Sequence, residues 1–177
     1  VAVSWLFRRA RVHKADRFFR RAQLVSAALY SLGHGGNDAQ KTMGIITGLL
    51  VTSGYLSKFE VPLWVILISH LAIALGTLFG GWRIVKTMGS KITRLTAVSG
   101  SCASMGGAIS LGLATFGGVP VSTTHTITGS IVGVGTAQDV RAVRWAITFN
   151  LVVAWVLTIP AAGLIAAAFW HVGRTFL

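Results

Sequence analysis

The segment Ser31–Ile46 (SLGHGGNDAQKTMGII) places four polar side chains beside glycines inside a long hydrophobic region. These side chains are His34, Asn37, Asp38 and Lys41. Ionisable groups are costly within a bilayer and usually mark functional sites there. The glycines predict a non-helical break in a membrane-spanning helix, with Asn37 as the N-cap of a helix that starts at Asp38.

A second polar interruption, Gly117–His125 (GGVPVSTTH), divides another uncharged region. Its glycines are expected to end one half-helix, and Pro120 is expected to lead into the next. Three adjacent hydroxyl residues then follow, Ser122, Thr123 and Thr124. Discontinuous helices of this kind are typical of secondary transporters, which bind their substrates near the middle of the membrane.

The two breaks together predict an anion site. The N-terminus of a half-helix presents backbone N–H groups and a positive dipole end, which favour an anion. Neighbouring hydroxyls suit an oxyanion that loses its hydration shell. The carboxylate of Asp38 would repel that anion unless a cation or proton lies between them, so we assign Asp38 to the coupling ion.

Simpler interpretations exist for each of these residues. Asp38 and Lys41 are three residues apart and could form a helical ion pair, which is compatible with transport. His34 could be a packing or capping residue, and His125 could hydrogen-bond a neighbouring carbonyl. The three hydroxyls could bond back to helix carbonyls. Glycine-rich stretches such as Gly106–Gly107 and Gly129–Gly135 favour helix packing.

The composition indicates an integral membrane protein. Of 177 residues, 53% are hydrophobic and 11% are charged, and the formal net charge is +12. The basic residues lie in short segments between long apolar runs, as in cytoplasmic loops of membrane proteins, so we expect no nucleic-acid partner. The single Cys102 excludes a disulfide framework and a cysteine zinc site.

The apolar runs predict an all-α polytopic bundle with re-entrant half-helices. A broken region at 22–56 and an unbroken span at 62–82, whose Pro62 suits a first helical turn, are followed by an uncharged region at 95–138 and a last run at 145–168. Basic segments at 8–21, 83–94 and 141–144 separate them. An even number of crossings between these segments would place all three on the cytoplasmic side.

The expected domain organisation has two parts. Residues 1–21 are predicted to be the end of a preceding helix and a basic cytoplasmic connector. Residues 22–177 are predicted to form the transmembrane domain.

The motifs GHGGNDAQKTMG and VPVSTTHTITGSIVGVG resemble the two motifs in the C-terminal half of the PiT family of inorganic phosphate transporters. The lysine-containing variant is similar to the second of the family's two related copies. The resemblance extends from about Gln23 to Thr136. It implies one of two inverted-topology repeats, with phosphate and the coupling ion bound where the broken helices of both repeats meet.

By motif position, the resemblance gives Asn37, Ser122, Thr123 and Thr124 a role in binding phosphate. Asp38, together with Asn37, would handle the coupling ion. Each motif occurs once, so the partner repeat is expected on other sequence of the same protein or on another subunit. Ser104 stands where sodium-associated relatives commonly have a glutamate, which favours a proton over sodium.

The sequence therefore predicts a phosphate symporter in the plasma (inner) membrane rather than an enzyme. A sulfate permease of the same fold is the nearest alternative. An intramembrane hydrolase using His34, Asp38, Ser122 and His125 is another, although no G-x-S-x-G or H-E-x-x-H motif supports it. The expected partners are phosphate, the lipid bilayer, the other repeat and a second copy of the chain as an oligomer. No cofactor other than the coupling proton or sodium ion is expected.

Overall fold

The computed structural model describes residues 2–7, 9 and 12–176, which are mostly helical and include no strand. The chain divides into two compact units, Val1–Val143 and Arg144–Leu177. The elements in chain order are α1 (Ala2–Leu6), α2 (Val12–Thr52), α3 (Leu63–Ser90), α4 (Ala97–Phe116), α5 (Thr123–Gln138), the 3₁₀ helix η1 (Val140–Ala142) and α6 (Trp145–Phe176). The predicted all-α membrane fold is confirmed.

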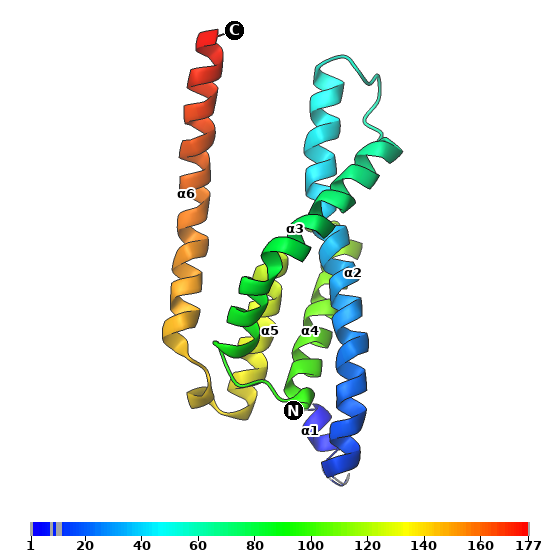
Figure 1. Ribbon diagram of the computed structural model, residues 1–177, viewed down its shortest axis with the longest axis vertical. Coiled ribbons are helices and arrows are strands. Elements are labelled where there is room, and N and C mark those ends of the chain that lie inside the picture. Colours follow the sequence, from blue (N-terminus) through cyan, green and yellow to red (C-terminus); the bar gives the residue numbers. More distant parts are fainter. Residues whose placement is uncertain (1, 8, 10–11, 177) are drawn as a thin grey trace. The chain divides into compact units, whose positions relative to one another are not determined.

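Helix α2 is continuous through Gly33–Asp38, so the prediction of a break there is wrong (Figure 1). Its 41 residues correspond to about 60 Å at 1.5 Å per residue. None of its glycines has a positive φ. An unbroken helix keeps every backbone hydrogen bond internal, which matters more in a membrane than the modest helix penalty of glycine. Asn37 is consequently an interior helical residue and not an N-cap.

Helix α3 runs back along α2 and is longer than expected. Pro62 occupies its N-cap position instead of its first turn, and the helix continues to Ser90. The predicted basic loop at 83–94 is therefore helical over most of its length. Ala39 and Met43 of α2 form a small apolar core with Val65 of α3.

Helices α4 and α5 form the predicted hairpin. Thr96 begins α4 with a capping box to Ser99. Gly117 ends that helix, and Gly118 adopts a φ of +66° in the turn. This left-handed conformation suits glycine because it has no Cβ. The chain then reaches Ser122, which caps α5, and returns toward the end where α4 began (Figure 1).

Of the glycine-rich stretches predicted to favour packing, Gly107 and Gly135 have close neighbours, whereas a Cβ on Gly129 or Gly133 would meet nothing within 4 Å. A Cβ on Gly107 would lie 3.0 Å from the ring of Tyr30 on α2 and 3.4 Å from Ile127 on α5. A Cβ on Gly135 would lie 2.8 Å from Val143. Helix α4 thus packs on the first half of α2 and against α5.

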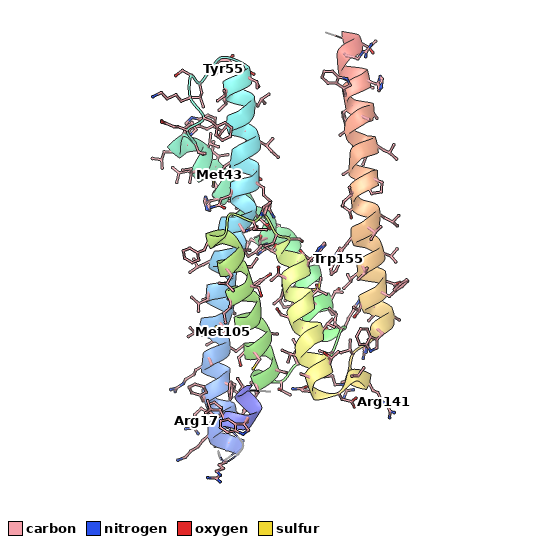
Figure 2. All side chains as sticks on the ribbon, turned by 180° about the vertical axis from the view of Figure 1, so that it is seen from behind. Arg17, Met43, Tyr55, Met105, Arg141 and Trp155 are labelled. Carbon is pink, nitrogen blue, oxygen red and sulfur yellow. The ribbon has the colours of Figure 1, made fainter. Side chains whose placement is uncertain are left out.

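Two basic residues of the first unit, Arg17 and Arg141, lie toward the same end of it (Figure 2). Figure 2 shows Arg17 of α2 and Arg141 of η1 at that end, with Tyr55 at the opposite end and Met43 between. Among the described residues, three stretches are long and apolar enough to cross a membrane, Leu63–Trp82, Ala97–Phe116 and Trp145–Thr175.

The second unit consists of helix α6. Its 32 residues include Pro160 without an interruption of the helix. The predicted last apolar run at 145–168 is therefore helical, and the helix continues beyond it to Phe176.

Candidate functional site

Asp38 is the centre of a polar cluster between α2 and the start of α5. Its Oδ2 lies 3.0 Å from His34 Nε2 and accepts a hydrogen bond of 3.0 Å from the hydroxyl of Thr123. Its Oδ1 lies 3.1 Å from Lys41 Nζ. The carboxylate is 32% exposed. A cation and a hydroxyl donor from two elements therefore hold Asp38 in place, and the predicted ion pair with Lys41 is present.

Lys41 also joins α2 to the hairpin turn. Its ammonium donates a second hydrogen bond of 2.8 Å to the backbone carbonyl of Val121. Val121 belongs to the non-helical segment between Gly117 and Ser122. The amino group thus lies between a carboxylate oxygen and a carbonyl oxygen.

Tyr30 of α2 also binds the beginning of α5. Its hydroxyl donates to the backbone carbonyl of Thr123 at 2.7 Å. Its ring stacks with that of His34, with ring centroids 6.1 Å apart. Thr123 is therefore fixed to α2 through both its side chain and its carbonyl, and only 3% of it is exposed.

The three predicted hydroxyl residues occupy different positions at the start of α5. Ser122 is exposed and accepts a hydrogen bond of 3.4 Å from the backbone N–H of His125. Thr123 is buried against Asp38. Thr124 is half-buried, and its carbonyl accepts from Thr128. Hydrogen bonds back to helix carbonyls are made instead by later residues of α5, including Thr126, Thr128 and Ser130.

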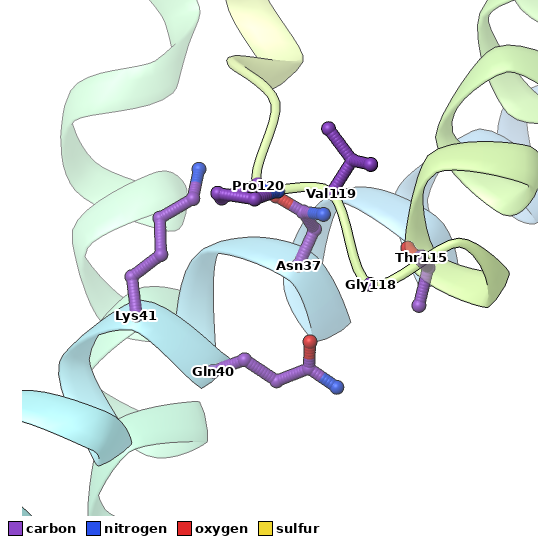
Figure 3. Close-up of a pocket in the computed structure, with 7 residues that line it drawn as sticks. All are labelled: Asn37, Gln40, Lys41, Thr115, Gly118, Val119 and Pro120. Atoms are coloured by element: carbon purple, nitrogen blue, oxygen red, sulfur yellow. The ribbon is translucent and has the colours of Figure 1, made fainter.

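A pocket of about 290 Å³ lies between α2 and the hairpin turn (Figure 3). The α2 side chains of Asn37, Gln40 and Lys41 line one wall. Thr115 and the turn residues Gly118, Val119 and Pro120 line the other. Asn37 is 5% exposed, and its Oδ1 is buried without a hydrogen-bond partner in the described part of the chain. A buried amide oxygen without a partner is costly, and a donor bound beside it would remove that cost.

The structure brings His34, Asp38, Lys41 and Thr123 together and places Asn37 and Ser122 nearby, at the pocket and at the start of α5. Sequence reasoning missed Tyr30, the carbonyl of Val121 and the pocket residue Gln40. Tyr30 lies four residues before His34 and eight before Asp38, which is the spacing of one helix face. Because a break was expected at the glycines, Tyr30 and Asp38 were not expected to lie on one face of the same helix. Among the described residues, no group of three or more His, Cys, Asp or Glu side chains could hold a metal ion.

Comparison with models of known protein families shows to which family the chain belongs. The model of the phosphate transporter family matches residues 5–166. The chain belongs to the phosphate transporter family.

Relatives within the phosphate transporter family are similar along most of the chain. A probable low-affinity inorganic phosphate transporter of Rhizobium meliloti (strain 1021) is 65% identical over 166 residues. The protein of the same description from Bacillus subtilis (strain 168) is 43% identical over 166 residues. In both comparisons the match covers 93% of this chain and 50% of the relative.

A solved structure shares the fold. It is described as the sodium-dependent phosphate transporter, and it superposes with a TM-score of 0.83 at 31% sequence identity. The match covers 99% of this chain and 45% of that structure. The chain therefore spans about half the length of the relatives it matches.

Proposed function

We propose that this chain forms one half of a secondary transporter that carries inorganic phosphate across the plasma membrane. The observation that supports this most is the hydrogen bond from Thr123, at the start of α5, to Asp38 of α2, beside a pocket that Asn37 and Lys41 line. A helix N-terminus with hydroxyl residues suits an oxyanion. The names of the relatives, which are phosphate transporters, support phosphate as the anion.

Each site residue has a distinct proposed role. Ser122 and Thr124 bind phosphate through their hydroxyls, and Thr123 does so through its backbone N–H because its hydroxyl hydrogen goes to Asp38. The Asn37 amide binds phosphate from the α2 wall of the neighbouring pocket. Asp38, with Asn37, handles a coupling proton or sodium ion. His34 positions Asp38, Lys41 balances its charge, and His125 orders the first turn of α5.

The second half of the site is proposed to come from the other repeat of the same protein. Coverage of about half of each relative supports this arrangement. The two repeats would have inverted topology, and rocking between them would give alternating access. No cofactor is proposed beyond the coupling ion, and a second copy of the protein is the proposed oligomeric partner.

The proposed orientation places the basic segments 8–21, 83–94 and 141–144 in the cytoplasm. The described basic residues Arg17 and Arg141 lie toward the same end of the first unit, which supports this assignment (Figure 2). A hydrolase is disfavoured because the hydroxyl that donates to Asp38 belongs to Thr123, which is buried, and not to the exposed Ser122.

Uptake of labelled phosphate into proteoliposomes containing the full-length protein tests this proposal. We expect uptake to follow an imposed proton or sodium gradient, and an excess of unlabelled phosphate to compete far better than sulfate. Asp38→Asn should lower gradient-driven uptake at least tenfold because it removes the charge that handles the coupling ion. Full gradient-driven uptake by Asp38→Asn would refute the role of this carboxylate, and equal competition by sulfate would support the alternative substrate.

A further inference from the structure

The ammonium of Lys41 lies in surroundings that resemble those of a bound metal cation. It is 3.1 Å from Asp38 Oδ1 and 2.8 Å from the carbonyl oxygen of Val121. The second oxygen of the same carboxylate accepts from Thr123. Carboxylate, carbonyl and hydroxyl oxygens are the ligands that hard cations prefer.

The carbonyl of Val121 is available because it belongs to the non-helical segment between α4 and α5. Carbonyls of unwound segments commonly coordinate sodium in transporters with broken helices. In this chain the carbonyl oxygen of Val121 instead accepts a hydrogen bond from Lys41 of α2. The lysine ammonium is a compact charge on a flexible stem, and its attachment to α2 keeps it at the site.

We propose that Lys41 is a built-in monovalent cation that excludes sodium from the position between Asp38 and the Val121 carbonyl. The charge of the ammonium offsets that of the carboxylate without a dissolved ion, so the start of α5 can accept an anion beside Asp38. Lys41 is thus a specificity-determining residue for the coupling ion. Its relevance to transport rests on the proposed function, whereas the exclusion of sodium can be measured without transport.

The solved structure that shares this fold is described as the sodium-dependent phosphate transporter, whereas we propose that sodium is excluded from the position beside Asp38 in the present chain. A shared fold does not require a shared coupling ion, since the coupling ion depends on the particular groups at the site. The proposal predicts that this position in the present chain does not bind sodium.

The test is the thermal unfolding of the purified full-length protein without phosphate, in sodium chloride and in choline chloride at equal ionic strength. The wild type should have the same midpoint in both salts. Lys41→Met keeps most of the stem but removes the charge, so sodium can bind Asp38 and the Val121 carbonyl. Its midpoint should rise by about 3 °C in sodium, with a saturable dependence on concentration.

Four variants control this experiment. Lys41→Arg keeps the positive charge, and Lys58→Met removes a lysine from the loop before α3, so both should stay insensitive to sodium. Combining Lys41→Met with Asp38→Asn should abolish the acquired sodium effect. Lys41→Gln provides a second neutral side chain if Lys41→Met does not fold.

A rise in the wild-type midpoint that is specific to sodium and lost in Asp38→Asn would overturn the proposal. Equal midpoints in both salts for Lys41→Met and Lys41→Gln would also overturn it, since Lys41 would then be only a structural ion-pair partner. If the sodium effect appears as expected but the protein takes up no phosphate, the proposed function fails while the inference about Lys41 stands.

Discussion

Thr123 and Asp38 are 85 positions apart in the sequence, and the threonine hydroxyl donates to the carboxylate at 3.0 Å. This bond connects the first residue of α5 to the middle of α2. The N-terminus of α5 and the ionisable face of α2 therefore form one site, and changes on either element should affect the other.

Thr123→Val tests that connection because it removes the hydroxyl and nearly preserves the shape. The loss of a hydrogen bond to a charged group should lower the free energy of unfolding by about 1.5–3 kcal/mol. Gradient-driven phosphate uptake should fall with it, since Asp38 would lose the donor that orients it. Thr136→Val, near the other end of α5, should change neither the melting temperature nor the uptake appreciably. Wild-type uptake and stability in Thr123→Val would contradict this account.

Tyr30 is a positioning residue for the same turn. Tyr30→Phe keeps the ring stacked on His34 but removes the donor to the Thr123 carbonyl. We expect a decrease of about 1 kcal/mol in the free energy of unfolding, measured by chemical denaturation. Tyr55→Phe is the matched control because Tyr55 is 81% exposed in the loop after α2. If both variants lost the same stability, the hydrogen bond of Tyr30 would have no special role.

Gly107 should not tolerate a side chain. The added methyl of Gly107→Ala would lie 3.0 Å from a Tyr30 ring that its hydroxyl bond and its stacking hold in place. Overpacking of this kind typically costs about 1–3 kcal/mol. On the same helix, Gly112→Ala meets nothing within 4 Å and should be neutral or stabilising. Melting temperatures of the two variants check this contrast, which would vanish if α4 did not pack on α2.

The turn between α4 and α5 requires glycine at one position. Gly118 has a φ of +66°, where a side chain costs about 1–2 kcal/mol. We expect Gly118→Ala to lower the thermal midpoint and to weaken phosphate binding, because Val119 and Pro120 follow directly in the pocket wall. Gly129→Ala, whose added methyl would meet nothing within 4 Å in α5, should have neither effect.

The hairpin could be predicted from the sequence because its signals are local. Gly118 needs a left-handed conformation, and Ser122 is a favoured N-cap, so the residues themselves mark the turn and the start of α5. The all-helical membrane class followed from composition and the length of the apolar runs.

The continuity of α2 could not be read from its glycines alone. Glycine permits either a break or a helix, and the surroundings decide between them. Here Gly33 packs near Leu111 of α4, where a methyl group on the glycine would lie 3.5 Å from the leucine Cβ, and the helix passes through. The partners of Asp38 on α5 and the Tyr30 contact depend on how the hairpin packs against α2, which spacing along the sequence does not specify.

The binding of labelled phosphate to the purified full-length protein tests the central claim most directly. The claim is that phosphate binds at the start of α5, so Ser122→Ala and Thr124→Val should each weaken binding about tenfold, equivalent to about 1.4 kcal/mol. Ser130→Ala, whose hydroxyl bonds back to the carbonyl of Thr126, should bind like the wild type. Wild-type affinity in both Ser122→Ala and Thr124→Val, with melting temperatures unchanged, would contradict the claim.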